Sequence, residues 1–353
     1  LSPKTAETEY WLAFLKNRRK DAGFLAVLKE AHAVSPNLTF PFRSETAEVL
    51  KWAIENDQTW QPKYYLALIH LSRNDDLQAW KLLNECGNKP DYAPFYAARS
   101  ELAAKLNKNN ESLADLNRAR EIDPGQWRYG RSLVTYYTNT VKQYPKAVEV
   151  ARSYFSKEPR NYQIGLLLAK SLLLDGQYLE CAGHLSKLNV LPYEGASEGV
   201  QMYREAHLML ALAAIKSGDY PDALAHIADS RLWPENLGAG KPYQEEIDER
   251  PADWLLSIAA EKLKKTEESK SALNRIVAFN KQGASINTLI SAMALKKLGR
   301  QAEAQKLMND WVVRDKSRLA QWAMRLFQGR PADDLMADDS NFRVIRECIK
   351  LGL

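Results

Sequence analysis

Cysteine is scarce in this sequence of 353 residues, and its positions argue against two common ways of stabilising a chain. The three cysteines, Cys86, Cys181 and Cys348, lie far apart and form no Cys-X-X-Cys pair. A disulfide framework or a structural zinc site needs paired or closely spaced cysteines. The sequence therefore predicts neither, and it favours three buried free thiols.

Long hydrophobic runs and an excess of one charge are also missing. A transmembrane helix needs about 18 or more apolar residues, and the longest apolar stretch, AHLMLALAAI at 206–215, is far shorter and favours a buried helix. The 49 basic and 44 acidic residues give a net charge of +5, and no sustained basic run occurs beyond KNRRK at 16–20. Nucleic acid is therefore not a predicted partner.

The first residue is Leu and not Met, which predicts that the sequence starts inside a longer gene product. Hydrophobic residues make up 45% and charged residues 26% of the chain. These values are ordinary for a globular protein and argue against disorder. A cytoplasmic location is favoured, although no targeting signal decides it.

What the sequence does contain is an internal repeat of two helices, in which a small residue recurs in the second helix. These small residues are separated by 33, 35, 34, 42, 49 and 32 positions: Ala79, Ser112, Ala147, Cys181, Ala223, Ala272 and Ala304. A second small or compact residue lies 12 positions earlier in each copy: Ala67, Ser100, Thr135, Ala169, Ala211, Ala260 and Ala292. Small side chains at both positions allow two antiparallel helices to approach closely, so the pattern predicts about seven helical hairpins.

The pattern resembles the tetratricopeptide repeat, which has a period of about 34 residues, small residues at these positions and a Gly turn between them. Gly176, Gly218 and Gly299 supply that turn in the clearest copies. The resemblance implies an all-α fold, with hairpins stacked in a right-handed superhelix, an α-solenoid, around a concave groove. The predicted organisation is degenerate helical pairs at 1–60, repeats at 61–230, an insertion at 231–250, further repeats at 251–314 and capping helices at 315–353.

The insertion contains the sequence WPENLGAGKPY at 233–243. A phosphate-binding loop is not predicted, because it needs Gly five residues before its Gly-Lys pair and Ser or Thr after it, where this chain has Glu235 and Pro242. The large apolar residues Trp233, Leu237 and Tyr243 instead predict an ordered loop that packs against the following helix pair. Its edge supplies the candidate ligand contacts of the loop: Trp233, Asn236 and Lys241.

This motif carries a second resemblance. It is similar to a segment of bacterial tetratricopeptide proteins that have, upstream of their repeats, a galactose-mutarotase-like β-sandwich domain of uncharacterised function. The resemblance implies that the chain is the C-terminal repeat region of such a protein. It also implies a link to carbohydrate through the linked domain.

No coherent catalytic set is apparent. GASEG at 195–199 matches Gly-X-Ser-X-Gly, but no strand precedes it as a nucleophile elbow requires. The acidic run EEIDE at 245–249 favours a solvated first helical turn. The five histidines form no His-Glu-X-X-His motif and are scattered among the repeats: His32, His70, His184, His207 and His226. The sequence therefore predicts no enzyme activity, no metal site and no cofactor.

The groove is the predicted binding surface, because repeat folds commonly bind there. The repeat register points these side chains inward: Tyr64, Glu101, Lys105, Tyr129, Tyr136, Asn139 and Lys170. They lack the Lys and Asn pattern that grips a peptide's terminal carboxylate, and for each of them packing between repeats is the alternative. Two functions stay open: a non-catalytic scaffold that binds a peptide or partner protein, and an accessory region of a larger carbohydrate-active or carbohydrate-binding bacterial protein.

Overall fold

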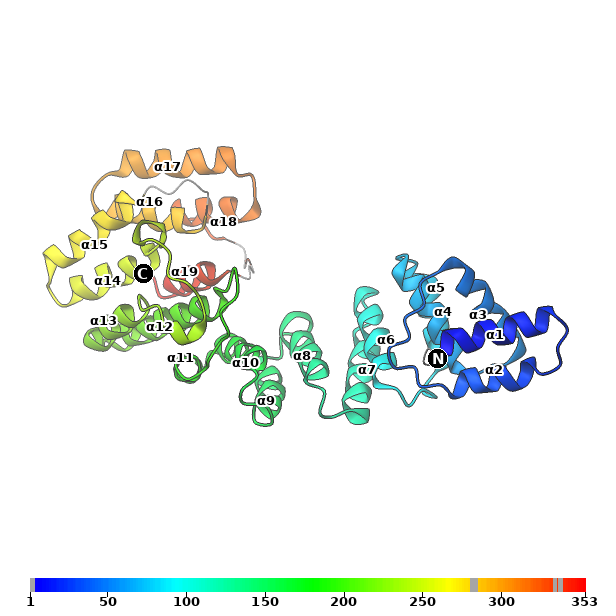
Figure 1. The fold of residues 1–353 in the computed structure, drawn as a ribbon. Coiled ribbons are helices and arrows are strands. Elements are labelled where there is room, and N and C mark those ends of the chain that lie inside the picture. The colour runs from blue at the N-terminus through cyan, green and yellow to red at the C-terminus, as the bar shows by residue number, and fades with distance from the viewer. Residues whose placement is uncertain (1–3, 280–284, 333–334, 336–338) are drawn as a thin grey trace. The chain divides into compact units, whose positions relative to one another are not determined.

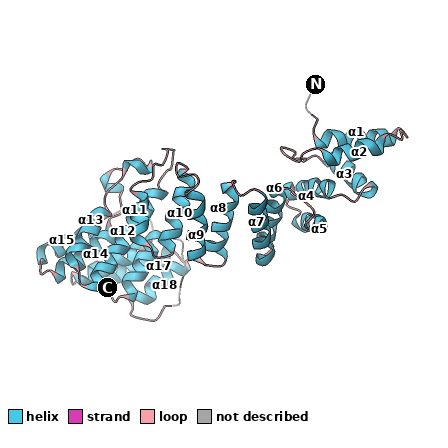
Figure 2. Cartoon of the chain, turned by 90° about the horizontal axis from the view of Figure 1, so that it is seen from below, coloured by secondary structure: helices cyan, strands magenta, loops and turns pink. Residues whose placement is uncertain are grey.

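A computed structural model describes residues 4–279, 285–332, 335 and 339–353 (Figure 1). These residues form helices and connecting loops without any strand (Figure 2), so the predicted all-α class is confirmed. No helix within the described ranges has the length and apolar character that a bilayer crossing requires. The contacts between residues divide the chain into two compact units, Leu1–Lys142 and Gln143–Leu353, called unit 1 and unit 2 below.

Unit 1 is built from antiparallel helix pairs and ends in a short π-helical turn. Its elements are α1 (Ala6–Arg18), α2 (Phe24–Ala33), α3 (Ser44–Asn56), α4 (Trp60–Ser72), α5 (Asp76–Cys86), α6 (Ala93–Lys105), α7 (Asn109–Ile122), α8 (Trp127–Thr135) and η1 (Tyr136–Thr140). Two successive hairpins of the predicted array, α4 with α5 and α6 with α7, pack closely here.

Unit 2 contains the remaining hairpins and the predicted insertion. Its elements are α9 (Tyr144–Phe155), α10 (Tyr162–Leu174), α11 (Tyr178–Leu185), α12 (Glu198–Ser217), α13 (Tyr220–Asp229), the 3-10 turns η2 (Glu235–Leu237) and η3 (Gln244–Glu246), α14 (Arg250–Lys262), α15 (Thr266–Ala278), α16 (Asn287–Lys297), α17 (Gln301–Arg314), α18 (Arg318–Phe327) and α19 (Ser340–Lys350). The pairs α12 with α13, α14 with α15 and α16 with α17 repeat the hairpin seen in unit 1.

The hairpin turns share one geometry. One residue of each turn has a positive φ, between 55° and 83°: Asn74, Asn107, Lys142, Gly176, Gly218, Lys264 and Gly299. In six of the seven turns the N–H of the next residue donates to the carbonyl five residues before it. In the turn at Gly218, for example, the Asp219 N–H donates to the Ala214 carbonyl (2.9 Å). This is the Schellman pattern that ends a helix and reverses the chain. The turn after η1 lacks it, and the boundary between the units falls at this turn.

The small positions lie where the two helices of a hairpin meet, except in two copies. Thr135 is exposed, in the hairpin that the unit boundary divides. In the α14/α15 pair the left-handed turn residue is Lys264, which lies five positions before Ser269. Gly218 and Gly299, the turn residues of two other hairpins, lie the same five positions before the small residues Ala223 and Ala304. The Ser269 hydroxyl donates to the Ser257 carbonyl (2.9 Å). The equivalent pair is therefore Ser257 and Ser269, and the predicted register of Ala260 and Ala272 was wrong by three residues.

Replacing Ala211 by leucine tests the close approach of α12 and α13. Ala211 and Ala223 are both 0% exposed, so three added carbon atoms must displace packed neighbours. We expect the free energy of unfolding to fall by about 1 to 3 kcal/mol, measured by urea denaturation. Ala213 lies on the exposed face of the same helix, and Ala213→Leu is the control. Equal transition midpoints for the two variants would contradict the proposed packing.

The last helix differs most from the predicted end cap. Helix α18 packs on α16 and α17, whereas α19 returns to α12 and also contacts α14 and α16, which are the first helices of three hairpins (Figure 1). Arg343 on α19 pairs with Glu205 on α12 through Nε–Oε1 (2.5 Å) and Nη2–Oε2 (2.7 Å), and Glu205 is only 2% exposed. A buried carboxylate requires such a partner, which explains why α19 lies on this face.

Candidate functional site

A pocket of about 1020 Å³ opens in unit 2 between α14, α16, α18 and the end of α19. Its floor is apolar and its rim is mainly basic. The apolar lining consists of Trp254, Ile258, Leu289, Met293, Leu326, Phe327, Ile349 and Leu353, and the rim of Glu261, Lys262, Lys264, Lys296 and Lys297. This set is called the lysine-rimmed pocket below.

The helical period explains this arrangement. Trp254 and Ile258 are four residues apart on α14, and Leu289 and Met293 are four apart on α16, so each pair forms one stripe on its helix. The lysines follow at the C-terminal ends of the same helices or just beyond, where the helix dipole favours positive charge. The apolar floor and the basic rim therefore arise largely from successive turns of α14 and α16.

The rim lysines differ in their contacts. Lys296 Nζ donates to the Phe327 carbonyl (3.2 Å) and lies 4.4 Å from the centre of the Phe327 ring. Lys297 pairs with Glu261 and lies 5.6 Å from the Trp254 ring. Lys262 and Lys264 are exposed and form no ion pair with any residue that the structure describes. Four lysines against one glutamate leave the rim positive.

The predicted groove residues are divided between the two units. Six of them belong to unit 1 and only Lys170 to unit 2. Tyr64 is 3% exposed and packs against the rings of Tyr65 (5.7 Å) and Phe95 (5.6 Å), and burial raises the pKa of its phenol. Tyr129 and Tyr136 are 8% and 7% exposed. Tyr64 and Tyr129 therefore pack in the hydrophobic core of unit 1, which is the predicted alternative to ligand contact, and Tyr136 packs against the ring of Tyr137 (5.7 Å).

The polar members of the set keep more exposure. Glu101 and Asn139 are exposed. Lys105 Nζ pairs with Asp76 Oδ2 (2.5 Å) on the preceding hairpin. Lys170 lines a small polar pocket of about 230 Å³ together with Glu205 and Arg343. Contact of these four residues with a ligand stays a prediction.

The insertion is held by polar contacts to the segment that precedes α12. The Asn236 amide donates to the carbonyls of Leu185 (2.9 Å) and Leu188 (2.8 Å), and the Val190 N–H donates to the Asn236 carbonyl (2.8 Å). Trp233 Nε1 donates within the loop to the Ala239 carbonyl (2.9 Å). The tip of the loop thus packs on the end of α11 and the segment after it. The start of the insertion contacts the following pair, as predicted, because Arg231 Nη2 donates to Asp253 Oδ1 on α14 (2.8 Å).

Three further details of the insertion concern predicted residues. Leu237 is 1% exposed, whereas Tyr243 is 77% exposed and does not contribute the predicted burial. Both amide protons of Asn236 are used by backbone carbonyls, so its amide group cannot also donate to a ligand without leaving them. Lys241 is exposed, and ligand binding by it stays a prediction.

The acidic run at 245–249 is only partly solvated, which differs from its predicted role. Burial raises the pKa of Glu249, which pairs with Arg204 (3.1 Å). Burial also opposes ionisation of Asp248, but hydrogen bonds from Arg250 (2.5 Å) and Asn287 (2.9 Å) lower its pKa below the ordinary value. These carboxylates fix the end of the insertion to its neighbours.

Comparison with known proteins finds no matching family model and no matching curated protein. Among solved structures, the chain is similar to one of Naa15/Naa10 bound to HypK-THB, with 13% identity over 93% of this chain and 45% of that chain and a TM-score of 0.49. PilW, a widely conserved type IV pilus biogenesis factor, has 14% identity over 63% of this chain and 94% of that chain, with a TM-score of 0.34. Yeast Tom70 has 15% identity over 90% of this chain and 62% of that chain, with a TM-score of 0.34.

The chain spans less than half of the Naa15/Naa10-complex chain that it matches. At these identities and TM-scores the similarities carry no functional information. The fold rests on the chain itself: hairpins with one turn geometry, paired small residues and no strand in the described residues. The described chain is therefore an α-solenoid of tetratricopeptide-like helix pairs.

Proposed function

We propose that this chain is a non-catalytic protein-interaction scaffold, and that its lysine-rimmed pocket binds an acidic segment of a partner protein. The observation that carries the proposal is the combination of an apolar floor with a rim of four lysines and one glutamate. A segment that inserts a large apolar side chain between flanking carboxylates complements both features.

The expected energies fit a binding site of moderate affinity. Burying one large apolar side chain contributes about 1.5 to 3 kcal/mol. Each exposed lysine adds up to about 1 kcal/mol and mainly accelerates association. Helix α19 supports the proposal. It contacts α12, α14 and α16, and its apolar residues Phe342 and Ile345 are buried. These first helices thus accommodate an amphipathic segment.

The potential nucleophiles support a non-catalytic role. Ser197, at the centre of the Gly-X-Ser-X-Gly match, contacts Gln201 (3.4 Å), and α12 follows it. The three cysteines are free and buried, as predicted. Burial raises the pKa of each thiol to about 12, so they stay protonated near neutral pH. A protonated, buried thiol is a poor nucleophile.

Peptide binding tests the proposal. Two fluorescent dodecapeptides with the same central leucines and tryptophan, one with flanking glutamates and one with flanking lysines, serve as probes in fluorescence anisotropy. We expect the acidic peptide to bind more tightly, and its affinity to fall as salt rises. In the variant Lys262→Glu/Lys264→Glu we expect about tenfold weaker binding, which corresponds to about 1.4 kcal/mol.

The control variant carries the same change of charge elsewhere. Lys306 on α17 and Lys316 are exposed and do not line the pocket, so Lys306→Glu/Lys316→Glu should bind the acidic peptide nearly as the unchanged protein does. Equal affinity for both peptides, or an equal loss in both double variants, would contradict a site at this pocket.

The carbohydrate-linked alternative stays a prediction. The motif on which it depends has a structural explanation in this chain. Asn236 fixes the loop by donating to two backbone carbonyls. Gly238 has a positive φ of 68°, and the Val190 carbonyl oxygen leaves no space for a Cβ at this position. No described contact of the loop favours a sugar over a peptide.

A further inference from the structure

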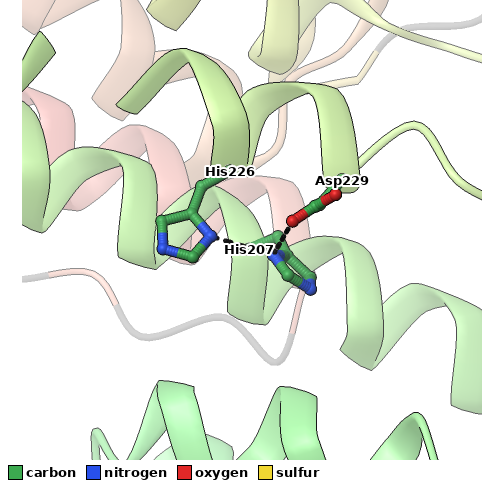
Figure 3. Close-up of side chains that lie close together, drawn as sticks. All are labelled: His207, His226 and Asp229. Atoms are coloured by element: carbon green, nitrogen blue, oxygen red, sulfur yellow. Dashed lines mark hydrogen bonds and ion pairs between the residues drawn. The ribbon is translucent and has the colours of Figure 1, made fainter. Parts of the chain in front are cut away.

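Two histidines and an aspartate meet on one hairpin of unit 2, outside the lysine-rimmed pocket. His207 projects from α12, and His226 and Asp229 project from α13 (Figure 3). The potential ligand atoms of all three lie within 4.8 Å of one another. His207 Nδ1 is 3.2 Å from His226 Nδ1 and 3.7 Å from Asp229 Oδ2.

The hairpin register explains why they meet. His226 and Asp229 are three residues apart and therefore share one face of α13. His207 lies one turn before Ala211, and His226 lies one turn after Ala223, the two small residues at which the antiparallel helices approach. The close packing at Ala211 and Ala223 thus places the three side chains opposite one another.

The distances fit a bound metal ion. Zinc binds imidazole nitrogen at about 2.0 to 2.1 Å and carboxylate oxygen at about 2.0 to 2.2 Å, so two ligand atoms at a tetrahedral angle lie about 3.3 to 3.6 Å apart. The separations of 3.2 and 3.7 Å are close to this value. The third separation, between the ligand atoms of His226 and Asp229, is within 4.8 Å, so small side-chain movements bring all three atoms to an ion.

A hydrogen bond between two neutral imidazoles explains only the distance of 3.2 Å. It gives Asp229 no role, because 3.7 Å exceeds a hydrogen bond from His207 Nδ1. Asp222 supplies a further feature of metal sites, since its Oδ2 lies 3.7 Å from Nε2 of His226. Metal-bound histidines commonly direct their second ring nitrogen to a carboxylate, which orients the ring.

From this geometry we propose that His207, His226 and Asp229 bind one divalent transition-metal ion of the zinc type. Two imidazoles and one carboxylate suit zinc and its neighbours better than magnesium or calcium, which prefer oxygen ligands. Asp229 is 44% exposed and leaves a position for water. The ion links α12 to the last residue of α13, directly before the insertion begins.

Titration with two metal ions tests this site on the full chain after removal of bound metal with a chelator. Co²⁺ serves as the spectroscopic probe, and Zn²⁺ is followed by competition with a chromogenic indicator. We expect one equivalent of each to bind and the visible Co²⁺ bands to show nitrogen coordination. His226→Gln and Asp229→Asn should each weaken binding at least tenfold, and Zn²⁺ should raise the melting temperature of the unchanged protein more than that of either variant.

His70→Gln is the matched control, because His70 also faces a carboxylate, Asp75 at 2.9 Å, but no second histidine. It should bind both ions as the unchanged protein does. Far-UV circular dichroism of His226→Gln verifies that the helices are intact. Absence of saturable binding at equimolar metal, or full binding by the folded His226→Gln and Asp229→Asn variants, would overturn the proposal.

Discussion

Replacing Asp115 by alanine is expected to lower the free energy of unfolding of unit 1 by about 3 to 5 kcal/mol. Arg99 is 7% and Asp115 is 5% exposed. The guanidinium donates Nε to Oδ2 (2.8 Å) and Nη2 to Oδ1 (2.7 Å) of Asp115. Without the carboxylate a buried positive charge loses its counterion. The Gly87 carbonyl, 2.7 Å from Nη1, still accepts a hydrogen bond but supplies no negative charge.

Denaturant unfolding followed by far-UV circular dichroism measures this loss. The control is Glu121→Ala on the same helix, because the Arg118–Glu121 pair is exposed and solvent screens it. The double change Arg99→Met/Asp115→Leu removes both charges, and it should recover much of the stability. An Asp115→Ala midpoint equal to that of Glu121→Ala would show that the buried pair does not stabilise unit 1.

The repeat was predictable because it depends on local sequence. Gly and Asn at the turns and small residues 12 positions apart need no tertiary information. The error in the α14/α15 pair has a definite cause. Two pairs of small residues with the same spacing are present, Ala260 with Ala272 and Ser257 with Ser269. Because the insertion lies before them, counting one repeat length from the preceding hairpin does not decide between the two pairs. The turn residue that decides between them is Lys264, and lysine carries no turn signal.

The binding surfaces depend on contacts between distant parts of the sequence. The lysine-rimmed pocket requires Phe327 and Ile349 beside Trp254, and the position of α19 depends on a pair between Glu205 and Arg343, 138 residues apart. Spacing alone does not reveal such pairs. The histidine cluster is different, because its residues lie at fixed offsets from Ala211 and Ala223. Comparing all histidines and carboxylates with the small positions of their own hairpin would have revealed it.

The insertion shows how a short motif can encode packing. Gly238 has φ of 68°, a left-handed conformation that L side chains rarely adopt, and a Cβ there would lie 2.7 Å from the Val190 carbonyl oxygen. Gly238→Ala is therefore expected to cost about 2 to 5 kcal/mol, as the sum of about 1 to 2 for the backbone conformation and about 1 to 3 for the clash. The obstacle is backbone, so rotation of a side chain cannot relieve it.

Limited trypsin digestion measures the result, because a displaced loop exposes the cleavage site between Arg231 and Leu232. We expect Gly238→Ala to be cut there much faster than the unchanged protein. Gly240→Ala is the control, since a Cβ at Gly240 meets nothing within 4 Å. Equal cleavage rates in the two variants would contradict this account of the loop. Faster cleavage in Gly238→Ala alone would show that the Pro-Glu-Asn-Leu-Gly segment fixes the insertion to the residues before α12, because the two glycines differ mainly in that contact and in φ.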